Sequence, residues 1–351
     1  MTAEPREGLR DTEPYVSPQL PVVARLNTNE CPHPLPEGFF DELADAIRDV
    51  PLNRYPDGSM RRLREELADV HGWTPEGTWT ANGSNEVLTQ LLQAYGGPGR
   101  RALVFEPTYL LHRRIGLLTH TEVEARRLPE DFVLSGTDVD TALAVAPEVV
   151  FVCSPNNPTG NAQPLAVVQA LAAALPTTLV IIDEAYGEFV PERSARALLE
   201  THDNLAVVRT FSKAFAMAGA RVGYVLADPS IVGDLERVRL PYHLSALAQT
   251  AAIVALHHRS EALHLLDAVR RQRERIATEL AVMPGVTVFP SDANFVLFVP
   301  PGDAVAVWQG LLDRGVLIRD MTAVVPGALR VTAGSEQETD LFLGAMKEVP
   351  G

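Results

Sequence analysis

Two polar residues stand in the sequence where buried strands are expected to end. Asp183 directly follows the apolar run 179–182, and Lys213 comes shortly after the run 205–208. A carboxylate in such a place costs free energy unless a cation or a strong donor meets it. A lysine removed from water has its pKa lowered toward neutrality, which leaves the amine able to form a Schiff base. The pair therefore points to chemistry on a carbonyl compound. The alternatives are that Asp183 only caps a helix and that Lys213 is an ordinary surface lysine.

Two further loops follow apolar runs and carry candidate binding groups. The segment 82–86 is rich in small residues and leads into an expected helix over 87–95. Backbone N–H groups at such a helix start bind anions, although a turn with an N-cap explains the same pattern. The loop 154–160 contains two prolines and a glycine, so it presents the amide of Asn157 in one orientation.

Together these residues suit one cofactor. Ligands of an open α/β sheet gather at the carboxyl ends of its parallel strands, so we expect these segments to meet at one edge. Pyridoxal phosphate needs a lysine, a carboxylate that keeps its pyridine nitrogen protonated, and donors for its phosphate. Lys213 and Asp183 match the first two needs, and the helix start, Ser212 and Arg221 match the third. The sequence therefore predicts pyridoxal 5'-phosphate as the cofactor.

Short β-branched runs that alternate with helical patterns must position these groups. The runs near 102–105, 149–153, 179–183 and 205–209 indicate strands buried on both faces, which is typical of a mainly parallel sheet covered by helices. After about residue 230, long helical patterns lead into a strand-helix-strand-strand-helix order that favours a smaller α+β domain.

The expected organisation is an arm followed by two domains. Residues 1–25 begin with a polar, proline-containing stretch and are predicted to form an N-terminal arm. Residues 51–240 are predicted to form the large cofactor-binding domain. Residues 26–50 and 241–351 together are predicted to form the small domain.

Composition excludes several classes of function. Lys and Arg number 30 against 45 Asp and Glu, and the net charge of −15 disfavours nucleic acid as a partner. No apolar run is long enough to span a membrane. Two cysteines and an N-terminus without an apolar signal segment favour the cytoplasm. His257, Glu261 and His264 share a helical face, but we interpret it as a solvated face and expect no metal site.

The residues resemble the fold-type I aminotransferases and, within that superfamily, the class II family of histidinol-phosphate aminotransferases. The resemblance covers the chain from about residue 15 to the final helix. It is carried by Leu26-Asn-Thr-Asn-Glu30, Asn53-Arg-Tyr-Pro56, Ala81-Asn-Gly-Ser-Asn-Glu86, Pro107-Thr-Tyr109, Ser154-Pro-Asn-Asn-Pro-Thr-Gly160, Asp183-Glu-Ala-Tyr186, Arg209-Thr-Phe-Ser-Lys-Ala-Phe215, Pro241-Tyr-His-Leu-Ser245 and Leu329-Arg-Val-Thr-Ala-Gly334. It implies an α/β fold with a mainly parallel sheet in a large domain and a smaller α+β domain.

The resemblance also implies a role for each matching residue on the cofactor side. Lys213 would form the Schiff base and move a proton, and Asp183 would pair with the pyridine nitrogen. Tyr186 would be the third catalytic residue. The remaining contacts would come from Asn157 and Tyr186 on the ring hydroxyl, Tyr109 on the ring face, and Ser84, Asn85, Ser212 and Arg221 on the phosphate. Tyr55 would reach that phosphate from the other subunit, which implies a homodimer.

On the substrate side, the resemblance implies that Arg319 and Arg330 bind the substrate's phosphate, with Tyr15 from the arm and Asn29 beside them. A planar guanidinium suits an oxyanion because it offers paired donors. The implied reaction is transamination between an amino donor, histidinol phosphate, and a 2-oxo acid acceptor, 2-oxoglutarate, in histidine biosynthesis.

Other functions on the same scaffold stay open. An aminotransferase for aromatic or specialised-metabolite amino acids, or a decarboxylase of a phosphorylated amino acid, would share the cofactor, because function depends on the site and not on the fold. A cofactor-binding regulator or silent scaffold is a third alternative, which the net charge and the lack of a DNA-binding segment disfavour.

Overall fold

A seven-stranded sheet forms the larger part of the protein, whose computed structural model describes residues 3–10, 12–14 and 16–349. Its strand order is β2-β8-β7-β6-β5-β3-β4, and β8 runs antiparallel to both of its neighbours whereas the other pairs are parallel. The strands are β2 (Thr78–Ala81), β3 (Arg101–Glu106), β4 (Glu122–Arg127), β5 (Val149–Cys153), β6 (Leu179–Asp183), β7 (Leu205–Thr210) and β8 (Gly223–Ala227).

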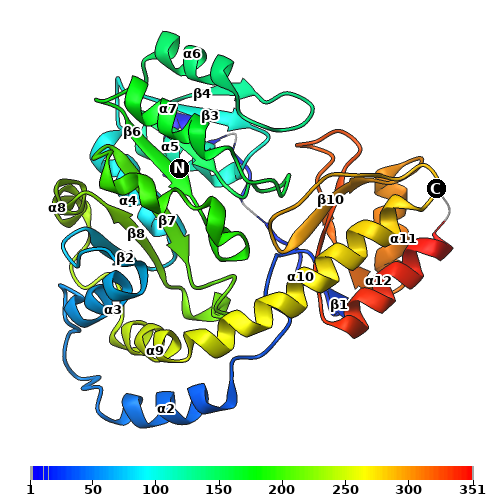
Figure 1. Cartoon of the computed structure of the whole chain (residues 1–351), viewed down its shortest axis with the longest axis horizontal. Helices are drawn as coiled ribbons and strands as arrows, with labels where there is room; N and C mark the ends of the chain where they lie inside the picture. The colour runs from blue at the N-terminus through cyan, green and yellow to red at the C-terminus, as the bar shows by residue number, and fades with distance from the viewer. Residues whose placement is uncertain (1–2, 11, 15, 350–351) are drawn as a thin grey trace.

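Helices cover both faces of this sheet (Figure 1). Every residue of β5, β6 and β7 is buried, which explains their nearly continuous Val and Ile content. Helices α4, α5 and α8 pack together on one side, and α6, α7 and η3 on the other. The helices are α3 (Arg61–His71), α4 (Ser84–Tyr95), α5 (Leu110–Thr119), α6 (Gly136–Val145), α7 (Leu165–Ala174), α8 (Pro229–Val238), η1 (Gly187–Phe189), η2 (Pro191–Arg193), η3 (Ala195–Glu200) and η4 (Ala218–Ala220). The α/β architecture predicted from the sequence is confirmed.

Parallel pairing of β5, β6 and β7 brings the predicted site residues to one edge of the large sheet. β5 pairs with β6 so that Cys153 lies opposite Asp183, and β6 pairs with β7 so that Asp183 lies opposite Val208. The loops that follow these three strands therefore leave the sheet side by side. The loop after β7 carries Lys213, and the loop after β5 carries Asn157.

A smaller antiparallel sheet of order β12-β13-β10-β9 lies beside the large one, with a two-stranded parallel pair of β1 and β11. We expected one strand over 316–319, but the chain there forms two strands in different sheets. The reason is that β11 pairs with the N-terminal β1, whereas β12 pairs with β13. The bounds are β1 (Ala24–Arg25), β9 (Thr287–Val288), β10 (Phe295–Val299), β11 (Val316–Leu317), β12 (Arg319–Asp320) and β13 (Leu329–Thr332).

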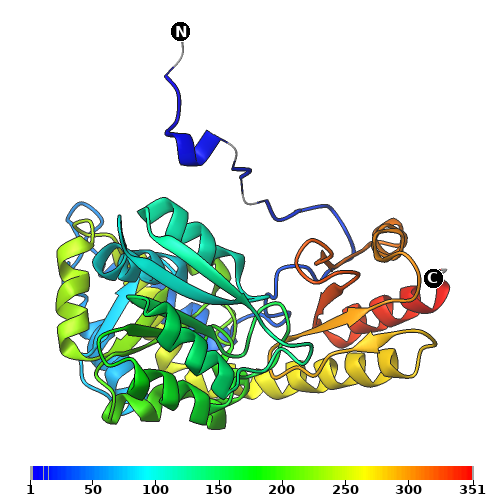
Figure 2. The ribbon, with the colours of Figure 1, turned by 90° about the horizontal axis from the view of Figure 1, so that it is seen from above.

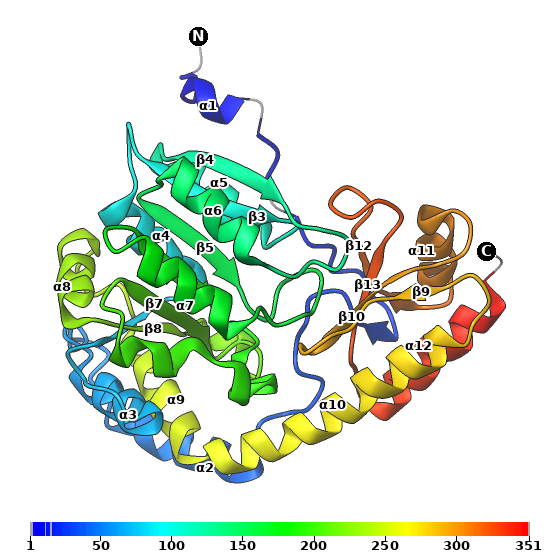
Figure 3. The same cartoon turned by 45° about the horizontal axis from the view of Figure 1, so that its top comes forward.

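A long helix, α10, extends from the large sheet to the small one (Figure 3). It follows α9 directly, and α9 packs against α2 and α3 at one end while α10 packs against α12 and β10 at the other. The remaining helices are α2 (Glu37–Arg48), α9 (Ala246–His257), α10 (Arg259–Ala281), α11 (Ala304–Asp313) and α12 (Glu336–Glu348). The expected division into arm, small domain and large domain stays a prediction.

The N-terminal segment projects from the body of the molecule (Figure 2), and hydrogen bonds join it to α5. It contains the short helix α1 (Glu7–Arg10). Arg6 Nη2 donates to the Leu117 carbonyl at 2.8 Å, and Arg114 Nη1 donates to the Glu13 carbonyl at 2.7 Å.

Within the described residues, no helix combines the length and the apolar character that a membrane crossing requires. The same part of the chain contains no group of three or more His, Cys, Asp or Glu side chains arranged to hold a metal ion.

Candidate active site

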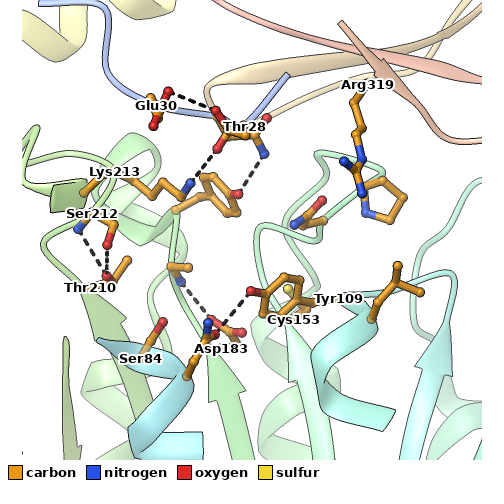
Figure 4. Close-up of a pocket in the computed structure, with 18 of the residues that line it drawn as sticks. Thr28, Glu30, Ser84, Tyr109, Cys153, Asp183, Thr210, Ser212, Lys213 and Arg319 are labelled. Atoms are coloured by element: carbon orange, nitrogen blue, oxygen red, sulfur yellow. Dashed lines mark hydrogen bonds between the residues drawn. The ribbon is translucent and has the colours of Figure 1, made fainter. Parts of the chain in front are cut away.

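A cavity of about 300 Å³ lies where the carboxyl ends of the large sheet face the segment after β1. Lys213 and Ser212 reach it from the loop after β7, and Asp183 reaches it from the end of β6 (Figure 4). The structure thus brings most of the predicted site residues to one cavity. The predicted residues that line it are Asn29, Ser84, Asn85, Tyr109, Asn157, Asp183, Tyr186, Ser212, Lys213, Arg221, Arg319 and Arg330.

Asp183 is almost completely buried and is held by two donors. Its Oδ2 lies 3.0 Å from His112 Nε2, and its Oδ1 accepts a hydrogen bond from the Ala185 backbone N–H at 3.1 Å. Because a carboxylate only accepts, Nε2 carries the proton of this contact. The His112 ring is fully buried and stacks on Phe151, with centroids 4.7 Å apart and an interplanar angle of 11°. The carboxylate is therefore fixed in orientation before any ligand arrives.

Sequence reasoning missed His112. The available signal was its position three residues after Tyr109, at the start of α5, because residues so spaced share one side of a helix. That spacing alone does not distinguish a functional histidine from a core one. The contact with Asp183, 71 residues away in the sequence, makes the difference.

Lys213 faces the cavity with its amine held by a single backbone acceptor. Nζ donates to the Thr28 carbonyl at 2.9 Å and lies 5.9 Å from the centroid of the Tyr186 ring. Removal from water, together with the positive charges of Arg330 and Arg221, lowers the pKa of this amine to about 8, against the opposing effect of Glu30. This pKa leaves about a tenth of the amine neutral at pH 7, and the neutral form is the one that acts as a nucleophile or proton acceptor.

A group of hydrogen-bond donors lies at the start of α4, at one corner of the cavity. Arg221 Nη1 donates to Ser212 Oγ at 3.1 Å, and the first residue of the helix, Ser84, lines the cavity beside them. Gly83 has φ +86°, and a Cβ there would lie 2.6 Å from Arg221 Nη2. A Cβ on Gly223 would lie 2.1 Å from the Ser84 backbone nitrogen. The two glycines therefore permit the close approach of guanidinium, helix start and strand that this corner needs.

Arg330 and Asn157 meet on the side of the cavity nearer the small sheet. Arg330 donates to Asn157 Oδ1 and, through Nη2, to the Asn27 carbonyl at 3.0 Å. Its guanidinium carbon lies 5.1 Å from the centroid of the Phe295 ring. The neighbouring Asn156 holds the loop by donating to the Pro107 carbonyl at 2.8 Å.

Tyr186 and Asn29 form a buried pair. Asn29 Nδ2 donates to the Tyr186 hydroxyl at 2.8 Å, and Thr332 Oγ1 donates to Asn29 Oδ1 at 3.1 Å. Burial raises the pKa of the Tyr186 phenol, so it stays a neutral donor and acceptor. Asn29 was predicted to contact substrate, and here its side-chain amide orients Tyr186.

Tyr109 and Asn85 close the wall opposite the small sheet. The Tyr109 hydroxyl donates to Asn85 Oδ1 at 3.2 Å, and the Tyr109 ring meets His112 edge-on at 5.6 Å. These contacts place an aromatic ring at the cavity surface above the buried His112.

Arg319 of β12 contacts the arm as well as the cavity. Its Nη1 lies 3.5 Å from the Val16 carbonyl and 3.4 Å from Ser17 Oγ. The predicted donor from the arm, Tyr15, lies outside the described residues.

Tyr55 does not line the cavity of its own chain. It is 79% exposed and stacks on Tyr242, with ring centroids 4.3 Å apart and an interplanar angle of 9°. Its contact with a cofactor bound in a second subunit stays a prediction.

A buried ionic network beneath the site was also missed. Arg209 donates to Glu184 Oε2 through Nη2 at 2.7 Å and through Nε at 3.1 Å, and its Nη1 donates to Glu188 at 3.2 Å. Burial raises the pKa of the Glu188 carboxyl. Both ends were present in the quoted motifs, since Glu184 follows Asp183 and Arg209 ends the strand run before Lys213. Their pairing joins the ends of β6 and β7.

The chemistry of the cavity fits pyridoxal phosphate. A pre-oriented carboxylate, a partly neutral amine and an aromatic ring surround one side of it, as the heterocycle of that cofactor requires. A guanidinium, a serine hydroxyl and a helix start meet at a corner that a Cβ on Gly83 would fill, which suits a phosphate group.

Comparisons with known proteins support the same cofactor. The profile of the family described as aminotransferase class I and II matches residues 21–346. A histidinol-phosphate aminotransferase of Frankia casuarinae is 51% identical, over 97% of this chain and 89% of that protein. One of Mycolicibacterium smegmatis is 47% identical, over 99% of this chain and 93% of that protein.

A solved structure shares the fold at lower identity. The histidinol-phosphate aminotransferase of Sinorhizobium meliloti, in complex with pyridoxal-5'-phosphate, has a TM-score of 0.83 and 26% identity, covering 93% of this chain and 91% of that one.

Proposed function

Because the chain belongs to the class I and II aminotransferases, we propose that it catalyses transamination between histidinol phosphate and 2-oxoglutarate, giving imidazole acetol phosphate and glutamate, in histidine biosynthesis. Pyridoxal 5'-phosphate is the cofactor of this reaction, and when bound it supplies an electron sink for the substrate's α-carbon. The observation that carries the proposal is the juxtaposition of Lys213, Asp183 and two arginines, Arg319 and Arg330, on one cavity. The names of relatives at 46–51% identity support the same substrate.

Lys213 is the residue that moves the proton at the substrate's α-carbon. Its pKa of about 8 lets the amine accept a proton near neutral pH and return it at the neighbouring carbon. Asp183 holds a positive charge on the heterocycle, and His112 keeps that carboxylate in place. Tyr186 and Asn157 orient the ring hydroxyl, and the Asn29 amide fixes Tyr186 in turn.

Arg221, Ser212, Ser84 and Asn85 hold the cofactor's phosphate, and Tyr109 lies on the face of its ring. The electrostatic reason is that a guanidinium and a helix start both stabilise a dianion. Arg221 already bonds Ser212, so little reorganisation is needed on binding.

Arg319 and Arg330 bind the acidic end of each substrate in turn. Histidinol phosphate offers a phosphate group and glutamate offers carboxylates, and a planar guanidinium pairs with either. Tyr15 of the arm adds a further donor to the phosphate. Arg319 also contacts the Val16 carbonyl and Ser17 Oγ, which holds these two arm residues against the cavity rim.

The active form is a homodimer in the cytoplasm. Large apolar side chains are solvent-exposed in the segment that follows α2 and in the one that precedes α9, namely Leu52, Tyr55, Leu240 and Tyr242. Tyr55 would donate to the phosphate of the cofactor in the second subunit. Sedimentation should give a dimer, and mixing Tyr55→Phe with Lys213→Ala chains should restore one fully native site in each mixed dimer.

The assignment is tested by substrate panel and by covalent trapping. The holoenzyme should transaminate histidinol phosphate in preference to phenylalanine, histidine and phosphothreonine, and Lys213→Ala should lose turnover.

The sequence contains two lysines, Lys213 and Lys347, so borohydride reduction followed by peptide mass analysis identifies the attachment site directly. Label on Lys347, or native turnover by Lys213→Ala, would contradict the proposal. Preference for a substrate without phosphate would favour the aromatic aminotransferase, and release of carbon dioxide from phosphothreonine would favour the decarboxylase.

A further inference from the structure

The charges that line the cavity are unevenly placed. Among the described residues that line it, the cations are Lys213, Arg221, Arg319 and Arg330, and the carboxylates are Asp183 and Glu30. Asp183 lies at the end of β6, beneath the cavity, and is already bonded to His112. Glu30 belongs to the segment after β1 and is drawn on the opposite side, near Lys213 and well separated from Arg319 (Figure 4).

One oxygen of Glu30 is available for a ligand. Thr28 Oγ1 donates to Glu30 Oε2 at 2.9 Å, and Arg25 Nη2 lies 3.4 Å from the same oxygen. Within the part of the chain that the structure describes, no hydrogen bond is made to Glu30 Oε1. Glu30 lines the cavity, and its side chain is 41% exposed. An ionised carboxylate accepts on both oxygens, so this group has unused capacity for an N–H donor.

We propose that Glu30 accepts a hydrogen bond from the ring N–H of the substrate's imidazole and so selects histidinol phosphate over amines with a hydrocarbon ring. The inference rests on the proposed function. The substrate's α-carbon bears an amine, a phosphate arm and an imidazole arm. The amine must approach Lys213, and the phosphate is drawn to the arginines. Glu30 is then the carboxylate left for the third arm, because Asp183 is occupied beneath the cofactor.

The chemistry of the two rings makes this contact discriminating. Imidazole carries an N–H in either tautomer and two when protonated, and its unperturbed pKa of about 6.5 leaves a protonated fraction near neutral pH. A phenyl ring has no donor, so it would desolvate Glu30 Oε1 without giving it a partner. Loss of a hydrogen bond to a charged group changes an equilibrium about 10- to 100-fold.

The test compares two phosphate esters that lack the amine and therefore undergo no reaction. These are 3-(imidazol-4-yl)propyl phosphate and 3-phenylpropyl phosphate, titrated by calorimetry into the holoenzyme. Glu30→Ala should weaken the imidazole ester about 10- to 100-fold and change the phenyl ester by less than about threefold. Glu30→Gln should fall between, because its amide still accepts but carries no charge. Unchanged binding of the phenyl ester shows that the variant site is intact.

Arg25→Gln is the matched control. It removes the ion-pair partner of Glu30 without touching the carboxylate, so it should leave the ratio of the two affinities as in the wild type. An equal loss for both esters in Glu30→Ala, or the same change of ratio in Arg25→Gln, would overturn the inference and indicate a structural role. The ratio of kcat/KM for histidinol phosphate and phenylalaninol phosphate should follow the affinities. Absence of histidinol phosphate turnover in the wild type would instead refute the proposed function.

Discussion

Replacing Lys213 by methionine should stabilise the cofactor-free protein near neutral pH. The amine has a pKa of about 8 in the folded chain and about 10.5 when unfolded, because folding removes it from water and places it near Arg330 and Arg221. Below pH 8 both states hold the proton, but the folded state holds it at a cost. The difference of about 2.5 pKa units corresponds to about 3 kcal/mol. Methionine has a similar length and no charge to desolvate.

Part of this gain is offset by a lost contact. Lys213 Nζ donates to the Thr28 carbonyl at 2.9 Å, and removing that donor costs about 1 kcal/mol. The net gain expected at pH 7 is therefore about 2 kcal/mol.

The pH dependence has a definite sign. Between about pH 8 and 10.5 the unfolded chain binds more protons at this site than the folded chain, so the stability of the wild type rises with pH in that window. The penalty for Lys213 falls to about 1 kcal/mol at pH 10, and the variant's advantage should disappear there.

Urea unfolding of the two apo proteins at pH 7, 8.5 and 10, at equal protein concentration, measures this difference. Lys347→Met is the control, since that lysine is 61% exposed and its pair with Glu279 at 3.3 Å is worth about 0–1 kcal/mol. A Lys213→Met variant no more stable than wild type at pH 7, or with a gain that persists at pH 10, would refute the claim that the amine is held desolvated and charged.

Three further outcomes are expected. His112→Phe keeps the stacked ring but removes the donor to Asp183, so the affinity for pyridoxal phosphate should fall about tenfold or more, as measured by fluorescence titration; unchanged affinity would mean that the contact does not position the carboxylate. Gly83→Ala places a Cβ 2.6 Å from a guanidinium nitrogen at φ +86°, so cofactor affinity should fall at least tenfold while circular dichroism stays native; retention of cofactor through gel filtration would argue against the phosphate corner. Glu184→Ala removes one of the two carboxylates that pair with Arg209, so the free energy of unfolding in urea should fall by about 3 kcal/mol. A decrease of less than about 1 kcal/mol would show that the network does not stabilise the fold.

Most of the cavity could be predicted because its residues follow local patterns. Asp183 and Lys213 stand at the ends of apolar runs, and an α/β sheet of parallel strands gathers such positions at one edge. The quoted motifs added Asn157 and Tyr186, Arg221 was predicted as a donor for the phosphate, and the structure has all three on one cavity.

The residues that were missed act through partners distant in the sequence. His112 is separated from its carboxylate by 71 residues, and Arg209 is separated from Glu184 by 25. The sequence alone does not distinguish a histidine or arginine that holds another polar side chain from one that packs in the core or lies on the surface. Its meaning depends on which polar group the packing brings within hydrogen-bond distance.

In the small sheet, the sequence predicts where a strand forms but not which strand it pairs with. The apolar run at 316–319 predicts one strand, but a single residue divides it between β11, paired with β1, and β12, paired with β13. Hydrophobic content indicates extended structure, whereas the choice of partner depends on where the N-terminal segment docks.

By itself, the sequence determined the alternation of strands and helices, the glycines and prolines of the loops, and the choice of Lys213 and Asp183 as the candidate amine and carboxylate. These are short-range properties, governed by side-chain periodicity and backbone preference within a few residues. Only the tertiary structure decided that His112 holds Asp183, that Asn29 holds Tyr186, and that Glu30 faces the cavity with an open oxygen. Those contacts join segments that are distant in the sequence and meet only through tertiary packing, and the hydrogen bonds of buried groups are satisfied across such distances.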